Sequence, residues 1–254
     1  MAQLSDDCFA FGGELMTTAE ALARLADSAH RVVEPEQCAL SESHGRILAR
    51  DVLSAHDVPP HDNAAVDGWA VYFDDLKAGE ETRLPWHERI PAGQPLGHGA
   101  PRGAALRIFT GAPMPVGEAG ASGPDTVLMQ EDCREEDGVV TIPPGIKRGA
   151  NRRHAGEDIK RGTTILEAGR RLKPQDIGLA ASVGLTTLAV FRPLRVAVFS
   201  SGDEVFEPGE TLPPGGIYDA NRLMIIALVE ALGCDVSDLG ILPDRLDAVQ
   251  GALQ

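Results

Sequence analysis

The sequence lacks an apolar run of the roughly 20 residues that a membrane-spanning helix needs. Its N-terminus, MAQLSDDCFA, has two aspartates where a secretory signal carries lysine or arginine, and no apolar segment follows. We therefore expect a protein of the cytoplasm that makes no membrane contact.

Cysteine pairs and an excess of positive charge are also missing. The four cysteines are far apart and none has CxxC spacing, so we expect reduced thiols rather than a zinc knuckle or a redox pair. The 38 acidic residues exceed the 23 basic ones and give a formal net charge of -15. Because nucleic-acid binding needs a basic face, this balance argues against a nucleic-acid partner.

The pattern of the first 60 residues predicts a helix followed by strands. Thr17 and Glu20 have the spacing of a capping box, and Leu15, Leu22 and Leu25 continue a helical stripe. The segment CALSESHGRILARDVLSAHDVPP then predicts a short strand, a helical turn and a second strand that ends at the double proline.

The middle of the chain has a different composition. Residues 68–146 are rich in proline and glycine and contain short β-branched runs, which predicts a small β-rich domain. After the charged segment KRGANRRHAGEDIKRG, a helix is expected to start at residues 173–176, where Pro174 suits the first turn, and to run to about residue 183.

The last part of the chain predicts a βαβ unit. The apolar run at residues 194–199 indicates a buried parallel strand, NRLMIIALVEALG a helix that Gly233 ends, and CDVSDLGIL the next strand. Asp219 or Asn221 can cap this helix. A doubly wound sheet needs several strands and about two are present, so we expect an α/β domain that is incomplete within these residues.

These patterns predict a fold of the α/β class that also contains a β-rich domain.

Two polar segments adjoin the predicted βαβ unit. SSGDE, residues 200–204, follows the buried strand, where α/β folds place ligands, and its carboxylates beside small residues suit an anion held through a divalent cation such as Mg²⁺. A solvated loop in which Asp203 caps a turn explains SSGDE as well. In GGIYDANR, Asp219 could face the same cleft as Asp203, although helix capping explains one of its polar residues.

Three further segments could bind a polar ligand. Residues 147–161 hold six of the basic residues, which predicts either a local positive potential for a phosphate or a charged interdomain loop. In RIFTGAPMP, prolines stiffen the turn that contains Thr110 and Gly111, and a plain turn is the alternative. PPHDNAAVDGWA is too polar for a core strand and too stiff at its start for a free linker.

In order along the chain, PPHDNAAVDGWAV, RIFTGAPMP, DTVLMQED, RRHAGEDI, SSGDEV, IYDANR and LGIL-x-D resemble the motifs of the molybdopterin molybdenumtransferases, the MoeA and gephyrin E-domain family. The resemblance implies a MoeA-like N-terminal region, in which residues 1–58 and 149–190 form one discontinuous elongated domain and residues 59–148 an inserted β-rich domain, followed by the start of a MogA-like α/β domain at residues 191–254. A later strand of the α/β domain with an SGG-type loop, and a separate C-terminal β domain, are expected outside these residues. VGEAGASGP, before Asp125, departs from the family as a loop insertion.

The resemblance implies an enzyme of molybdenum-cofactor synthesis that takes molybdate and adenylated molybdopterin, releases AMP with Mg²⁺, and leaves molybdenum on the dithiolene. It also implies a homodimer, with the site between the α/β domain of one subunit and the N-terminal region of the other, and a molybdopterin adenylyltransferase as the substrate donor.

By the same resemblance, residues of the matching motifs receive roles. Catalysis is assigned to Asp203, Asp67 and Glu157, and the metal to Asp203, Asp219 and Asp244. The expected substrate-binding residues are Asp62, Asn63, Thr110, Gly111, Asp158, Ser200, Ser201, Gly202 and Asn221.

Two other functions remain open from the sequence. One is a noncatalytic dimeric scaffold, which binding without turnover would support. The other is a general nucleotide-binding α/β protein, which a preference for plain ATP would support.

Overall fold

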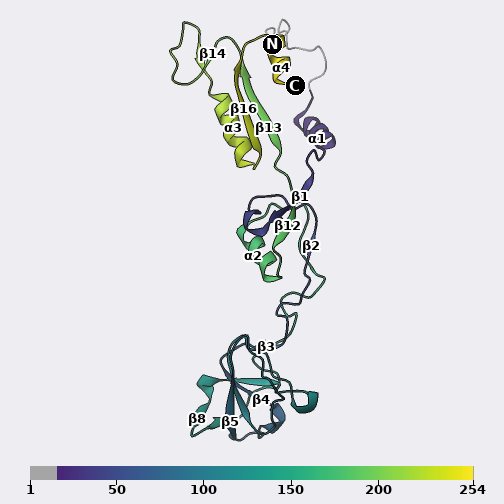
Figure 1. Ribbon diagram of the computed structural model, residues 1–254, viewed down its shortest axis with the longest axis vertical. Coiled ribbons are helices and arrows are strands. Elements are labelled where there is room, and N and C mark those ends of the chain that lie inside the picture. The colour runs from purple at the N-terminus through teal and green to yellow at the C-terminus, as the bar shows by residue number, and fades with distance from the viewer. Residues whose placement is uncertain (1–15, 254) are drawn as a thin grey trace. The chain divides into compact units, whose positions relative to one another are not determined.

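The computed structural model describes residues 16–253, and its elements are labelled in Figure 1. The chain forms two compact units: one ends at Glu36 and resumes at Phe191, and the other is Gln37–Val190. The predicted combination of a β-rich region and the start of an α/β domain is confirmed. The predicted division into three domains stays a prediction. No helix among residues 16–253 is long and apolar enough to cross a membrane.

A six-stranded mixed sheet dominates the unit Gln37–Val190, with the strand order β7-β4-β6-β5-β9-β8. Only β5 and β6 pair in parallel. Short 3-10 turns, η3 (Phe73–Asp75), η4 (Glu118–Gly120) and η5 (Gln130–Asp132), lie between the strands. The strands are β4 (Gly68–Val71), β5 (Thr82–Ile90), β6 (Ala105–Ile108), β7 (Thr126–Met129), β8 (Arg134–Glu136) and β9 (Val139–Ile142).

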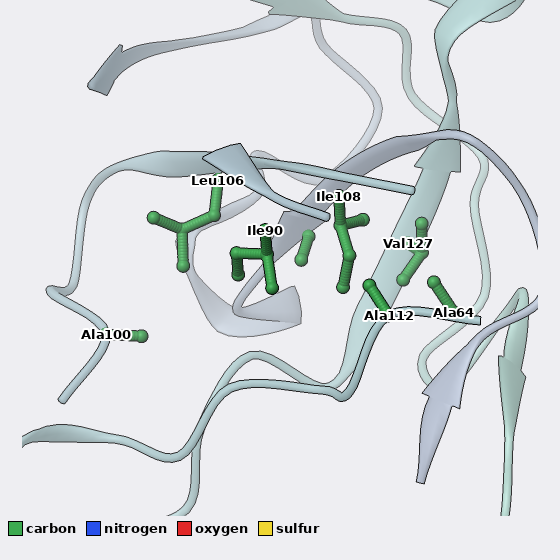
Figure 2. Close-up of a cluster of buried hydrophobic side chains, with 8 residues drawn as sticks. Ala64, Ile90, Ala100, Leu106, Ile108, Ala112 and Val127 are labelled. Carbon is green, nitrogen blue, oxygen red and sulfur yellow. The ribbon is translucent and has the colours of Figure 1, made fainter. Parts of the chain in front are cut away.

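Both faces of this sheet are covered by apolar clusters, because successive side chains of a strand point to opposite faces. In β4, Ala70 belongs to a cluster with Ile90 and Ile108, which Figure 2 shows. Its neighbours Trp69 and Val71 belong to the cluster on the other face. Every residue of β4 is buried, as expected for a strand with a partner on each side.

A smaller core lies in the rest of this unit. The strand β1 (Pro35–Ala39) pairs with β12 (Thr187–Phe191), and β2 (Val52–Leu53) pairs with β11 (Thr164–Leu166). With η2 (Leu40–Glu42) between β1 and β2, the predicted order of strand, helical turn and strand is confirmed. The helix α2 (Pro174–Ser182) starts at the expected proline. Its Ala180 is buried in a cluster with Leu48 and Leu172.

Two chain segments run side by side between these cores. Val58 bridges Ile159, and β3 (Asn63–Ala64) pairs antiparallel with β10 (Arg152–Arg153). The bond between Val58 and Pro59 is cis. This pairing brings the polar segments around residues 62 and 155 together.

The unit that resumes at Phe191 contains the predicted βαβ arrangement (Figure 1). The strand β13 (Arg195–Ser201) pairs in parallel with β16 (Asp235–Leu242), and α3 (Asn221–Ala231) contacts both strands. The short strands β14 (Val205–Phe206) and β15 (Ile217–Tyr218) pair in parallel, and α4 (Leu246–Ala252) follows β16.

The strand β13 differs from the expected buried strand. Only Val198 is buried within it. Among the described residues β13 has a single strand neighbour, β16, and helix contacts from α3, so much of its surface stays accessible.

The helix α1 (Thr18–Ser28) of the same unit has the predicted capping box. Thr17 accepts from the backbone N–H of Glu20, and the Glu20 carboxylate accepts from the Thr17 backbone N–H. Leu15, expected on its apolar stripe, lies outside the described residues. Leu22 and Leu25 are exposed.

Candidate functional site

The structure brings the predicted site residues together in two groups, one in each unit. The hinge group, in the unit Gln37–Val190, contains Asp62, Asn63, Asp67, Thr110, Gly111, Glu157 and Asp158. The strand-end group, in the other unit, contains Ser200, Ser201, Gly202, Asp203, Asp219, Asn221 and Asp244.

Asp67 and Thr110 form the first contact of the hinge group. One carboxylate oxygen of Asp67 accepts from both the backbone N–H and the hydroxyl of Thr110, each at 2.8 Å. These bonds favour the ionised form and lower the pKa of Asp67. Gly111, which has a φ of 80°, donates its N–H to the carbonyl of Ala64 at 2.9 Å. The turn of RIFTGAPMP is therefore fastened to PPHDNAAVDGWA.

Asp62 joins the same segment to residues near 155. Its carboxylate accepts from the backbone N–H of Ala155 at 2.8 Å and lies 3.4 Å from His154 Nδ1 and 3.6 Å from Arg152 Nε. Partial burial would raise the pKa of Asp62, but the Ala155 bond, Arg152 and His154 outweigh it and lower the pKa. Asp62 is thus held as a carboxylate at neutral pH.

Two buried polar atoms, one in the hinge group and one beside it, have no hydrogen-bond partner among the described residues. They are Asn63 Oδ1 and Arg152 Nε. Asn63 is the β3 partner of Arg153, so both atoms lie on the β3–β10 ribbon. Since buried polar atoms are nearly always bonded, an acceptor and a donor left open here suit a polar ligand or water.

Glu157 and Asp158 each form an ion pair with Arg153. Arg153 Nε lies 3.4 Å from Glu157, and its terminal nitrogen donates to Asp158. Glu157 also accepts from the backbone N–H of His154 at 2.9 Å. The carboxylates raise the pKa of Arg153.

The basic segment 147–161 is consequently less positive than its composition indicates. Arg148 pairs with Asp74 and Asp125, Arg152 faces Asp62, and Arg153 has two carboxylates. Local acidic side chains neutralise these arginines, which fits the alternative of a charged connecting loop.

The strand-end group begins where β13 ends. Ser200 and Ser201 pair with Ile241 and Leu242 of β16, and the exposed Asp203 follows in the next turn. Asp203 accepts from the backbone N–H of Asp244 at 3.3 Å. Gly202 has a φ of 139°, where any side chain would be strained, so this turn requires glycine. The two exposed carboxylates therefore lie at the carboxyl ends of adjacent parallel strands.

Asp219 has a different environment from the one expected. It is 3% exposed, and it accepts from the Arg222 backbone N–H at 3.1 Å and from Arg222 Nε at 2.9 Å. Arg222 is equally buried and also donates to Glu207 and Asp238. Burial would raise the pKa of Asp219, but the bonds from Arg222 and from the Ser200 side chain outweigh it and lower the pKa. Asn221 is exposed at the start of α3.

The predicted metal set does not form a three-ligand site within residues 16–253. No three His, Cys, Asp or Glu side chains of this range are arranged to hold a metal ion. Asp203 and Asp244 lie together, but the Asp219 carboxylate is bonded to Arg222. Asp203, Asp219 and Asp244 therefore do not form a common set of three ligands among the described residues, and the metal assignment stays a prediction.

Sequence reasoning missed the arginines that pack on aromatic rings near the hinge group. Arg107 lies over the rings of Trp69 and Phe109 and donates to the carbonyl of Gly68. Its only signal was its place as the first residue of RIFTGAPMP, because its partners come from other strands.

Comparison with known proteins places these residues in two family regions. Residues 16–184 match the family model "MoeA N-terminal region (domain I and II)", and residues 197–254 match "Probable molybdopterin binding domain".

Curated relatives match over most of the chain. The molybdopterin molybdenumtransferase of Haemophilus influenzae is 38% identical over 232 residues, which cover 91% of this chain and 55% of the relative. The molybdopterin molybdenumtransferase of Synechococcus elongatus is 34% identical, and the match covers 87% of this chain and 54% of the relative. The chain spans about half the length of these relatives.

A solved structure has the same fold. The molybdopterin biosynthesis moeA protein of Pyrococcus horikoshii superposes with a TM-score of 0.85 at 31% identity, covering 94% of this chain and 63% of that protein.

Proposed function

Since the chain belongs to the MoeA family, we propose that it takes part in molybdenum insertion, converting adenylated molybdopterin and molybdate to molybdenum-bound molybdopterin and AMP in the cytoplasm. The observation that carries this proposal is the exposed Asp203 at the carboxyl end of β13, in the region that matches a molybdopterin-binding model. Ligands of parallel α/β sheets bind at that edge.

Each group of residues has a distinct role in the proposed reaction. Ser200, Ser201 and Gly202 offer hydroxyl and backbone donors to an oxyanion, and Asp203 orients the reacting phosphoanhydride or molybdate. The exposed Asn221 adds an amide at the start of α3.

In the hinge group, Asp67 fixes the Thr110 hydroxyl, so that this turn presents a fixed polar surface. Asp62, Asn63, Glu157 and Asp158 hold the facing ribbon in place through their contacts with residues 152–155. In the proposed reaction, water cleaves the phosphoanhydride bond so that AMP leaves, and molybdate releases oxygen as water when the two dithiolene thiols bind molybdenum.

Mg²⁺ remains a proposal, supported by the carboxylates at this edge of the sheet. When bound, it would supply positive charge to the phosphates. Asp203 and Asp244 remain candidate ligands, and Asp219 is better explained as the partner of Arg222. AMP release that persists unchanged in a chelator would contradict the proposal.

We also propose a homodimer that receives its substrate from a molybdopterin adenylyltransferase. The support is the exposed apolar stripe of α1, with Leu22 at 61% and Leu25 at 66% exposure, together with the family resemblance. A monomeric mass in light scattering would contradict the dimer. A noncatalytic scaffold is the alternative function, since the buried pairing of Asp219 leaves fewer free carboxylates than expected.

The central role of Asp203 can be tested with Asp203→Ala. The account predicts that AMP release from adenylated molybdopterin with molybdate falls at least about 100-fold, a size common for loss of a transition-state contact. Glu230→Ala removes another exposed carboxylate of the same unit, on α3, and should leave the rate unchanged. Equal rates for Asp203→Ala and the native protein would refute the role of Asp203.

A further inference from the structure

A hollow of about 350 Å³ lies on one face of the six-stranded sheet. Three of its lining residues, Trp69, Arg107 and Gln130, belong to the motif segments, but none of them has a role in the proposed reaction. Its lining includes Trp69, Trp86, Arg89, Arg107, Gln130 and Glu135. We name this hollow the tryptophan pocket.

The register of the sheet aligns its main side chains. Arg107 of β6 is paired with Trp69 of β4 on one side and with Arg89 of β5 on the other. Residues paired across neighbouring strands share a face, so these three form a row.

A β-bulge is required for Trp86 and Arg89 to share that face. They are three residues apart, and in a regular strand they would point to opposite faces. The register between β5 and β6 shifts between Trp86 and Arg89, and Ile90 consequently enters the core cluster of Figure 2 while Arg89 lines the pocket. Bulges that redirect a side chain in this way are common next to functional sites.

Aromatic rings and guanidinium groups alternate across the pocket. Trp69 and Trp86 meet edge to face with ring centroids 5.3 Å apart. Arg107 lies 5.1 Å from the Trp69 ring and 5.0 Å from the Phe109 ring, and Arg89 lies 5.1 Å from the Phe109 ring. These stacked planes form a surface on which another planar group can stack.

Two guanidinium groups give the pocket positive charge. Within the described residues, neither Arg89 nor Arg107 has a carboxylate at ion-pair distance, and the carboxylates of Asp67 and Glu131 act on Arg107 from farther away. The pocket carboxylate, Glu135, accepts from Trp86 Nε1 at 3.2 Å. Burial raises the pKa of the Cys133 thiol to about 11, so this lining residue stays neutral.

In a second hollow of this unit, lined by Tyr72 and Phe73, ion pairs neutralise the arginines. There Arg102 lies 4.4 Å from the Tyr72 ring but pairs with Asp75, and Arg148 lies over Phe73 but pairs with Asp74 and Asp125. The tryptophan pocket and this second hollow have similar contacts between arginines and aromatic rings. They differ in that carboxylates form ion pairs with the arginines of the second hollow only.

We propose that the tryptophan pocket binds an anion that carries a planar heteroaromatic ring, with the ring on Trp86 and Arg107 and the anionic group on Arg89 and Arg107. The inference rests on the proposed function, because adenylated molybdopterin contains a pterin ring and an adenine ring joined through phosphates. The pocket would then hold one of these rings and its adjacent anionic group.

Tryptophan fluorescence tests the proposal directly, because the chain has two tryptophans and both line the pocket. AMP has a ring and a charge, adenosine has only the ring, and ribose 5-phosphate has only the charge. We expect AMP to change the emission saturably, with the other two binding at least about tenfold more weakly. Pterin-6-carboxylate, measured by calorimetry, distinguishes a pterin from a nucleotide as the preferred ring.

Two variants test whether the ligand binds in the tryptophan pocket. Arg89→Ala should raise the Kd of the preferred ligand at least about tenfold. Arg102→Ala, which removes the stacked arginine of the other hollow, should leave the Kd unchanged. Arg89 is exposed, so its substitution spares the core, and circular dichroism checks the fold.

Two results would overturn the inference: no saturable signal from any ring-bearing anion, or identical affinity in Arg89→Ala and the native protein. If either occurs while the protein releases AMP, the pocket assignment fails and the proposed function stands. Ring binding without AMP release would support the pocket assignment and contradict the proposed function.

Discussion

At the start of α3, Asp219 and Arg222 lie three residues apart and bond through both backbone and side chain. The sequence pattern YDANR shows two polar residues able to cap a helix; the N-cap position is Ala220, and Asp219 accepts from the Arg222 backbone N–H in the first turn. What the pattern cannot show is that β16 and the segment after β14 bring Asp238 and Glu207 to the same guanidinium. A residue predicted as a metal ligand is therefore the buried partner of an arginine.

Replacing Arg222 should destabilise this unit strongly. Arg222→Met leaves the buried Asp219 carboxylate without its partner, and we expect the free energy of unfolding to fall by about 3–5 kcal/mol. Arg245→Met, which breaks the exposed pair with Asp247, should change it by less than about 1 kcal/mol. Urea unfolding followed by circular dichroism measures both.

The pH dependence gives this prediction a second readout. The pKa of Asp219 is lowered below its ordinary 3.8, so its stabilisation is present above that value and is lost as the pH falls through the folded-state pKa. In Arg222→Met the guanidinium bond is lost while burial, the backbone N–H of residue 222 and the Ser200 hydroxyl remain, so the pKa of Asp219 rises relative to the native protein and protonation relieves the defect. The difference in the free energy of unfolding between the Arg222→Met variant and the native protein should be smaller at pH 4.5 than at pH 7. An equal difference at both would contradict the assignment.

Other residue contacts could not be derived from sequence spacing. Thr17 and Glu20 are neighbours on one helix turn, and their capping box was predictable. Asp67 and Thr110 are brought together by the pairing of β4 with β6, and nothing local in either segment encodes that register.

At the scale of elements, β4 explains the segment PPHDNAAVDGWA. Its polar residues precede the strand and contact the facing ribbon, whereas GWAV forms a central strand between β6 and β7. The glycine of this segment has a steric cause: a Cβ on Gly68 would lie 1.7 Å from the carbonyl oxygen of Leu128 in β7.

Gly68→Ala should therefore separate β4 from β7. We expect a loss of roughly 2–3 kcal/mol in the free energy of unfolding, because the clashing atom is backbone and cannot rotate away. Gly178→Ala in α2, where a Cβ meets nothing within 4 Å, should stabilise the protein by up to about 1 kcal/mol. Thermal unfolding compares the two. A Gly68→Ala protein as stable as the native one would show that this approach of the strands is not needed.

The helix and strand positions were more predictable than their surroundings. The apolar run at residues 194–199, Pro174 and Gly233 correctly indicated β13, α2 and the end of α3, because periodicity and turn residues act locally. The accessibility of β13 and the bulge in β5 depend on which strands lie alongside, and single-strand patterns contain no such information.

For the whole molecule, the order of motifs along the chain was the decisive sequence signal. No one segment identified the family, because SSGDE or TGAP alone fits an ordinary turn. Seven motifs in order did, and the match to two family regions confirms that assignment. The division into three domains and the pairing of two subunits depend on long-range contacts and stay predictions.

The measurement that tests the central claim most directly is AMP release by the purified protein supplied with adenylated molybdopterin, with and without molybdate. The account predicts AMP release that depends on molybdate and leaves molybdenum bound to the dithiolene. Binding of the substrate without AMP release would contradict it and favour a scaffold. A preference for plain ATP would contradict it in favour of a general nucleotide-binding protein.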